Sequence, residues 1–384
     1  MTEKLFYVDS HMITFSAVVK ACENKGDYYE AVLDRTAFFP EGGGQYADTG
    51  IIDGVKVFDA QEKDGLIYHK MEGPLEVGKT VEGTIDWEER FSKMQNHSGE
   101  HIVSGLVHQM FGYDNVGFHM GKDAITMDFN GVLTKEDLKV IEQKANEAVA
   151  KNFDIEILYP SKEELSEIVY RSKIEIEGQV RIVRFPGYDV CACCAPHVHH
   201  TGEIGLVKII GAMAHRGGMR LTILCGSRAL SDYQTKQKSV EQISALLSAK
   251  QPEVATAVAK TKEDQQALIY RINDLQKMVL EAELKSLPAP DTTEDVFLFQ
   301  KDLDTKAIRN AVNELCTRYT GYCGIFVGTD DTGYNFVLGS ATKDCRTAAA
   351  ILKDAYGAKC GGSERMIQGS VMATEKMIKG RIFN

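Results

Sequence analysis

Two segments of the chain carry side chains that could hold a metal ion. The first is Asn96-His97-Ser98-Gly99-Glu100-His101, inside a stretch with helical spacing of apolar residues. His97 and His101 are four residues apart, so both imidazoles lie on one face of a helix and can share an ion. Taken alone, such a pair is more often an ordinary surface pair than a pair of ligands.

The second segment is rich in Cys and His. Six metal-binding side chains fall within ten residues: Cys191, Cys193, Cys194, His197, His199 and His200. Two imidazoles from the helix, with Cys193 and His197, would make a tetrahedral site of the kind that zinc prefers. We therefore predict one Zn²⁺ per chain, held by His97, His101, Cys193 and His197. The remaining Cys and His side chains of the segment are reserve ligands.

A zinc peptidase is a weaker alternative. His97-Ser98-Gly99-Glu100-His101 matches the inverted peptidase pattern His-x-x-Glu-His, in which Glu100 would be the general base for a zinc-bound water. The pattern is short, and the Cys/His segment is unlike the distal ligand of a peptidase.

Charge argues against a protein that coats nucleic acid through its bulk charge. The formal net charge is −11 and the pI is about 5.5. Basic residues nevertheless gather in two places. Leu206–Arg228 contains Arg216 and no acid, and beyond Ala341 Lys and Arg outnumber Asp and Glu. Basic surface is thus concentrated in these two stretches.

The cysteines and the absence of long apolar runs indicate the cellular compartment in which the protein is expected. The chain has nine cysteines, its first residues show no apolar signal-peptide core, and no run approaches the ~20 apolar residues of a transmembrane helix. We expect a cytoplasmic protein that does not enter a membrane. Its cysteines are then buried, metal-bound or catalytic rather than paired in disulfides.

The elements predict an α+β chain of four parts. Short alternating strands and Gly-containing turns predict a β-barrel-like domain over 1–88. Helices opened by Asp86 and Thr134, with later strands, predict an α+β zinc-containing core over 89–229. Apolar residues spaced by four and three predict a coiled coil or helical hairpin over 230–287. A C-terminal α/β domain follows over 291–384. The coiled coil or this last domain could mediate a homodimer.

Three motifs together resemble a known family. Phe38-Phe39-Pro40-Glu41-Gly42-Gly43-Gly44-Gln45 with Asp48-Thr49-Gly50 resembles the Gly-rich signature of AlaX-type proteins, free-standing relatives of the alanyl-tRNA synthetase editing domain. The His97/His101 and Cys193/His197 pairs, the latter followed by Thr201-Gly202-Glu203-Ile204-Gly205, resemble that family's two zinc motifs. The coiled segment and Cys360-Gly361-Gly362-Ser363 look like the DHH-associated domain of the long forms.

This resemblance implies an ATP-independent trans-editing hydrolase without an aminoacylation half. It would deacylate Ser- or Gly-tRNA(Ala), a carboxylic ester, at the zinc site. The implied catalytic side chains are Glu100 and Gln45. The implied tRNA contacts are Gly43, Gly44, Arg216, Lys353, Lys359, Gly361, Gly362 and Arg365.

Two departures from the family pattern affect the substrate more than the reaction class. Glu100 stands where the family usually has Thr, and Cys194-Ala195-Pro196 stands where it usually has Gly-Gly-Thr. Both positions line the pocket near the amino acid. They leave open a second hypothesis, a tRNA-binding module whose editing site is vestigial, which deacylation assays on several mischarged tRNAs would distinguish.

Overall fold

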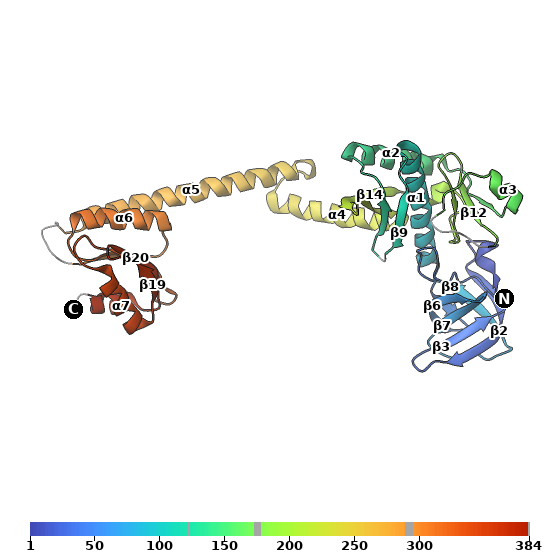
Figure 1. The fold of residues 1–384 in the computed structure, drawn as a ribbon, viewed down its shortest axis with the longest axis horizontal. Coiled ribbons are helices and arrows are strands. Elements are labelled where there is room, and N and C mark those ends of the chain that lie inside the picture. Colours follow the sequence, from blue (N-terminus) through green and yellow to red (C-terminus); the bar gives the residue numbers. More distant parts are fainter. Residues whose placement is uncertain (122, 173–177, 289–294, 383–384) are drawn as a thin grey trace. The chain divides into compact units, whose positions relative to one another are not determined.

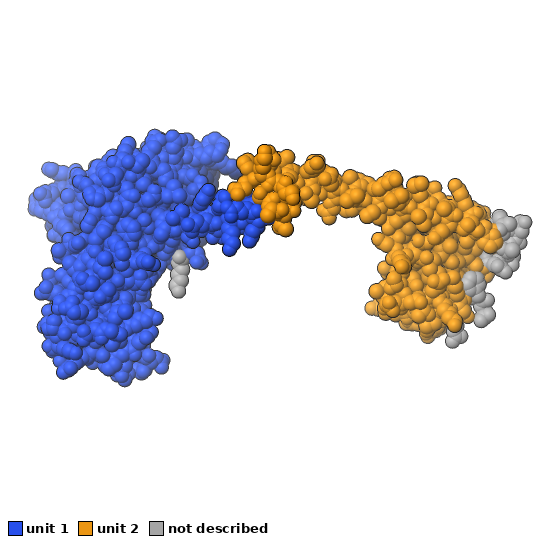
Figure 2. Space-filling model, turned by 180° about the vertical axis from the view of Figure 1, so that it is seen from behind, with its two compact units in different colours: residues 1–242 blue, residues 243–384 orange. Residues whose placement is uncertain are grey.

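The computed structural model describes residues 1–121, 123–172, 178–288 and 295–382. The chain is mixed α+β, as the sequence predicts, and divides into two compact units, residues 1–242 and 243–384 (Figure 2). The boundary between the units falls inside one helix, α4 (Gly226–Leu247). The four-part division therefore stays a prediction.

Six N-terminal strands close into a small barrel. Their order around it is β2-β3-β7-β6-β5-β8, and their bounds are Thr14–Asn24 (β2), Tyr29–Leu33 (β3), Gly50–Ile52 (β5), Val55–Lys63 (β6), Leu66–Met71 (β7) and Thr80–Ile85 (β8). Two further short strands, β1 (Glu3–Lys4) and β4 (Arg35–Thr36), form a separate parallel pair. Asp53-Gly54 and Asp64-Gly65 have positive φ at both residues, as tight hairpin turns require.

Helix α1 (Trp87–Phe111) begins directly after the barrel (Figure 1). Its predicted cap is confirmed, because the Asp86 carboxylate accepts a hydrogen bond from the Glu89 N–H at 3.1 Å. Gly112 ends the helix in the left-handed conformation. Two helical glycines allow close packing. A Cβ on Gly99 would lie 2.3 Å from Cys225 Sγ, and one on Gly105 would lie 2.2 Å from the Tyr188 carbonyl oxygen.

Two further sheets of the first unit pack around α1. The antiparallel order β14-β15-β10-β9 uses Val207–His215, Gly218–Cys225, Ile125–Phe129 and Asn115–Met120, and the order β11-β12-β13 uses Glu156–Leu158, Ile182–Phe185 and Asp189–Ala192. Helix α2 (Lys135–Lys151) begins with the predicted Thr134 capping box, and α3 (Lys162–Glu167) is a short turn of helix. Apolar side chains of α1, α2 and both sheets share one core.

The predicted helical region is helical, but its heptad seam is not packed. Helices α4 and α5 (Val254–Ser286) are separated by a short 3₁₀ turn that contains Pro252. Leu268, Ile272 and Val279 of the seam are more than half exposed. A coiled coil, and a homodimer formed through it, therefore stay predictions.

The second unit is built on a five-stranded sheet. Its order is β16-β17-β18-β20-β19. The strands are Val296–Gln300, Cys323–Thr329, Gly333–Gly339, Met366–Val371 and Lys359–Gly362, and the helices are α6 (Thr305–Arg318), α7 (Cys345–Tyr356) and α8 (Glu375–Ile382). Gly361 and Gly362 lie in the edge strand β19. Leu280 and Leu284 of α5 are buried in the core of this unit.

Among the described residues, every helix is too short or too polar to cross a lipid bilayer.

A buried histidine in the barrel predicts a pH-dependent stability. His69 is fully buried, with its Nε2 2.9 Å from Thr36 Oγ1 and its Nδ1 3.1 Å from the Ala31 carbonyl. Burial lowers the pKa of His69 to about 4. The unfolded chain binds this proton below about pH 6.5, so the free energy of unfolding should fall by roughly 2 kcal/mol between pH 6.5 and 5.

The measurement is urea unfolding at pH 7 and pH 5, followed by the fluorescence of Trp87, the single tryptophan. Over this range, we expect the free energy of unfolding of His69→Gln to fall by about 2 kcal/mol less than that of the parent protein. His108→Gln changes an exposed histidine and should behave like the parent. Equal pH dependence in the parent and His69→Gln would contradict the prediction.

Candidate functional site

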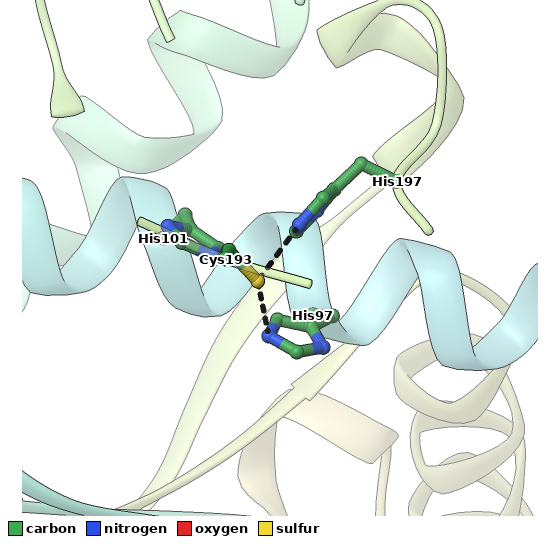
Figure 3. Close-up of side chains that lie close together, drawn as sticks. All are labelled: His97, His101, Cys193 and His197. Atoms are coloured by element: carbon green, nitrogen blue, oxygen red, sulfur yellow. Dashed lines mark hydrogen bonds between the residues drawn. The ribbon is translucent and has the colours of Figure 1, made fainter. Parts of the chain in front are cut away.

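The structure brings the four predicted metal ligands together (Figure 3). His97 and His101 come from α1, and Cys193 and His197 come from the loop that follows β13. Cys193 Sγ lies 3.6 Å from His97 Nε2 and 3.4 Å from His197 Nε2. One ligand atom from each of the four residues lies within 4.8 Å of all the others. The three histidines are buried and Cys193 is partly buried.

Each imidazole is held through its Nδ1 atom. The partner of His97 is Gln45 Oε1 at 3.0 Å, that of His101 is Asp189 Oδ2 at 2.8 Å, and that of His197 is Ser98 Oγ at 3.1 Å. In each ring this leaves Nε2 as the atom available to the cluster. Supporting contacts of this kind fix the tautomer and orientation of metal-binding histidines.

The surroundings of the cluster favour the metal-binding forms of Cys193 and His197. At His101, burial alone would lower the pKa, but hydrogen bonds with Asp189 and two cysteines outweigh it and raise that pKa well above its usual value. Burial by itself would raise the pKa of the Cys193 thiol, but His97 and His197 outweigh it and hold that pKa well below its usual range. Burial lowers the pKa of His197 to about 3, which keeps its imidazole neutral. Thiolate and neutral imidazole are the metal-binding forms of these side chains.

Asp189 is itself anchored by an arginine. Arg171 donates from Nε to Oδ1 at 2.8 Å and from Nη2 to Oδ2 at 2.7 Å. Burial alone would raise the pKa of Asp189, but its hydrogen bonds with His101 and Arg171 hold the pKa below the usual value. The carboxylate therefore stays ionised behind His101. The sequence analysis missed this pair, because its members come from separate segments.

The Gly-rich turn packs against the Cys/His loop. Gly43 and Gly44 have φ values of 60° and 80°. A Cβ on Gly43 would lie 3.0 Å from Cys194 Sγ, and one on Gly44 would lie 2.6 Å from the Phe118 ring. Both glycines line a cavity beside the cluster. Gln45 instead points inward and is fully buried against His97, so in this structure it positions a predicted ligand. Its catalytic role stays a prediction.

A buried charge network fastens the Gly-rich segment to α1. Asp48 accepts hydrogen bonds from the Phe39 N–H at 2.7 Å and from Arg90 Nε at 2.8 Å, and it also pairs with Arg90 Nη2. Lys93 donates to the Ala47 carbonyl at 2.6 Å. The side chains of Asp48, Arg90 and Lys93 are at most 1 % exposed. The only sequence signal was the presence of two cations early in a helix that follows an Asp-Thr-Gly motif.

A cavity of about 600 Å³ opens beside the cluster. Glu100 lines it together with His97 and His101. Glu100 Oε1 accepts hydrogen bonds from Ser104 Oγ at 2.7 Å and Asn115 Nδ2 at 2.6 Å, and Oε2 lies 4.0 Å from His101 Nε2. The structure thus places Glu100 beside the predicted ligands, as its position in the helix suggests.

The reserve ligands lie outside the four-residue cluster. Cys191 is buried in β13 near His101 and Asp189. Cys194 lines the cavity. His199 lies 3.1 Å from Asp9 and stacks on His11, while His200 pairs with Asp154 at 2.8 Å.

The predicted tRNA contacts lie on exposed surface in both units. Arg216 is exposed at the turn between β14 and β15, whereas Arg220 in the same basic stretch pairs with Asp128. In the second unit, all the predicted contacts are exposed: Lys353, Lys359, Gly361, Gly362 and Arg365.

Two family models match parts of the chain. The model for class II (A) tRNA synthetases matches residues 6–89, which hold the barrel and the Gly-rich segment. The model for the threonyl and alanyl tRNA synthetase second additional domain matches residues 180–221, which hold Cys193 and His197.

Curated relatives cover more of the chain. Alanyl-tRNA editing protein AlaX-L from Pyrococcus horikoshii is 29 % identical over 297 residues, which are 75 % of this chain and 74 % of that protein. Alanine–tRNA ligases from Halobacterium salinarum and Pyrococcus furiosus are 31 % and 33 % identical. They match 88 % and 64 % of this chain, which spans only 38 % and 28 % of their lengths. These similarities confirm the relationship that the motifs predict: the chain is related to AlaX-type alanyl-tRNA editing proteins and to the corresponding part of alanine–tRNA ligases.

Proposed function

We propose that this protein is a trans-editing deacylase that hydrolyses the ester of mischarged tRNA(Ala), with serine or glycine as the wrong amino acid. The observation that carries the proposal is the cavity itself, which is bordered by the His/Cys cluster, Glu100 and the Gly-rich turn. The similarity to a protein named as an alanyl-tRNA editing protein supports the same reaction.

The four side chains fit zinc. Three imidazole nitrogens and one thiolate form a ligand set that zinc binds tetrahedrally. The supports on each Nδ1 atom, from Gln45, Asp189 and Ser98, leave Nε2 for a metal. When bound, zinc would supply a Lewis acid that orders the site, anchors the substrate amino group or activates water.

The chain's own residues supply positioning and charge. An aminoacyl ester is already reactive, so a positioned water and a polarised carbonyl suffice for hydrolysis. Ser104 and Asn115 hold Oε1 of Glu100, which fixes its carboxylate at the cavity wall. There it would orient the attacking water or bind the substrate ammonium. Gly43 and Gly44 would let the terminal ribose approach the backbone closely.

A second candidate function is tRNA binding without hydrolysis. It is motivated by the departures from the family pattern, because Glu100 and Cys194, which stand at two of the changed positions, both line the cavity. Deacylation assays on Ser-, Gly- and Ala-tRNA(Ala) would distinguish the two functions. Release of serine or glycine supports editing, and inertness toward all three supports a vestigial site.

The metal proposal predicts about one zinc per purified chain by elemental analysis. The double variant His97→Ala, Cys193→Ala removes two of four ligands, so we expect its zinc content to fall close to zero. Cys194→Ala is the matched control, because Cys194 lies outside the cluster and should leave the zinc content unchanged. Full zinc occupancy in the double variant would rule out this ligand set.

Glu100→Gln tests the carboxylate. The amide keeps the shape and an acceptor for Ser104 and Asn115 but loses the charge. We expect deacylation of Ser-tRNA(Ala) to fall at least about tenfold, a barrier change of roughly 1.4 kcal/mol, with zinc content and urea midpoint nearly unchanged. The control is Glu136→Gln, which makes the same change at an exposed position of α2. Unchanged activity would make Glu100 a spectator, and joint loss of activity and zinc would make it a support of the metal.

Exposed cations of the second unit should contribute to tRNA affinity. A triple variant of the full chain, Lys353→Glu, Lys359→Glu, Arg365→Glu, reverses the charge at three of these positions. Because phosphate contacts release counterions, we expect weaker tRNA binding and a salt dependence of log K that is shallower by roughly 2–3. A charge-matched control reverses Lys135, Lys139 and Lys144, exposed on α2. Equal affinity and salt slope for the two triple variants would contradict a specific role for these cations.

A further inference from the structure

A second group of metal-binding side chains lies outside the cluster. Asp9, His11 and His199 each offer one ligand atom, and these three atoms lie within 4.8 Å of one another. His199 Nε2 is 3.1 Å from Asp9 Oδ1, and the rings of His11 and His199 stack with their centres 3.8 Å apart. His199, a predicted reserve ligand of the cluster, therefore has partners of its own.

Hydrogen bonds hold the side chains of this second group in place. Glu203 Oε2 lies 2.6 Å from His11 Nε2. Asp9 Oδ1 accepts a hydrogen bond from the His11 N–H at 2.8 Å. Ser10 Oγ lies 3.2 Å from His11 Nδ1 and donates to the His197 carbonyl at 2.7 Å. A carboxylate beside an imidazole, as Glu203 is beside His11, is the usual support of a metal-binding histidine.

The group is open to solvent on one side only. The side chains of His11 and Glu203 are 22 % and 25 % exposed. Those of Asp9 and His199 are about half exposed. A metal ion can therefore reach the group from water, while its inner imidazole stays largely covered. Imidazoles and carboxylates together form a ligand set that suits zinc and the neighbouring divalent transition metals.

The group joins two segments that are distant in the sequence. Asp9 and His11 precede the first strand of the barrel, β2, whereas His199 follows His197 by two residues in the Cys/His loop. An ion shared by the three side chains would therefore fasten the N-terminal segment to the loop that carries Cys193 and His197. Because an ion that binds only the folded protein stabilises it, occupancy would hold this loop in place.

We propose that Asp9, His11 and His199 form a second Zn²⁺ site, with Glu203 supporting His11. None of the three ligands is a thiolate, and two are half exposed. The site therefore binds zinc more weakly than the cluster and fills only when metal is added, so a purified chain still retains about one zinc. The site goes beyond the proposed function, because it would bind metal whether or not the protein hydrolyses an ester.

The test titrates Co²⁺ into the untagged full chain with zinc already bound at the cluster. Co²⁺ binds to the same kinds of nitrogen and oxygen ligands as zinc and quenches the fluorescence of a nearby indole. Trp87, the single tryptophan, is a local reporter because its ring centre lies 5.2 Å from that of His11. We expect saturable quenching of Trp87 fluorescence by one Co²⁺ per chain, reversed by added Zn²⁺.

Variants of the ligands should weaken this binding. Loss of a side chain that merely supports a metal ligand costs about 10–100-fold in affinity, so His11→Gln and His199→Gln should each raise the Kd for Co²⁺ at least about tenfold. Asp9→Asn should raise it as well, while keeping an oxygen that accepts the His11 N–H. The matched control is His200→Gln, which changes a similarly exposed histidine of the same loop that pairs with Asp154. Its Kd should equal that of the parent.

Equilibrium dialysis against Zn²⁺ separates the second site from the cluster without any measurement of ester hydrolysis. We expect two bound zinc ions per chain in the parent and one in the double variant His11→Gln, His199→Gln. The double variant His97→Ala, Cys193→Ala should also bind one, and it should keep the Co²⁺ response of Trp87. The proposal is overturned by one zinc in the parent, by quenching that does not saturate, or by an unchanged Kd in the His11 and His199 variants. Loss of the Co²⁺ response in the cluster variant would overturn it too.

Discussion

The buried ion pair between Asp48 and Arg90 is the constraint on which the geometry of the site depends. Asp48 ends the Gly-rich segment and Arg90 lies in the first turn of α1, seven residues before His97. The pair fixes the segment against the helix, and Lys93 adds a hydrogen bond to the Ala47 carbonyl. Removing one partner of a buried ion pair typically costs roughly 3–5 kcal/mol, because an unpaired charge remains inside. The pair thus lies close in sequence to both Gln45 and His97, which are hydrogen-bonded to each other.

The cluster is held from several directions at once. The supports of His97, His101 and His197 come respectively from the Gly-rich segment, from β13 and from α1 itself. The two histidines of α1 therefore meet the Cys/His loop only when barrel, helix and small sheet are all in place. Ser10 joins this arrangement by donating from Oγ to the His197 carbonyl at 2.7 Å. Residues far apart in the sequence thus determine where four ligand atoms lie, as a preorganised site requires.

Features that depend on neighbouring residues could be predicted from the sequence, whereas most contacts between distant residues could not. The caps of α1 and α2 and the hairpin turns were predictable, because each depends on a few neighbouring residues. The convergence of His97 and His101 with Cys193 and His197 was predictable because of residue chemistry and motif order. The Asp48–Arg90 and Arg171–Asp189 pairs were not, since neither spacing nor composition shows which distant charges meet. The apolar seam of α5 is a case in which a local pattern was misleading. Its spacing predicts packing against another helix, but its side chains are exposed in the described chain.

The two departures from the family pattern have different physical consequences. In Cys194-Ala195-Pro196, Ala195 is fully buried and packs in the barrel core, so its side chain faces away from a substrate. Cys194 lines the cavity, and its sulfur limits the space above Gly43. Glu100 adds a carboxylate to the lining of the same cavity. A larger residue at position 195 would therefore disturb packing between loop and barrel. Changes at Cys194 and Glu100 would alter the volume and charge that an amino acid meets, so the selection of substrate would rest on these two side chains rather than on the whole motif.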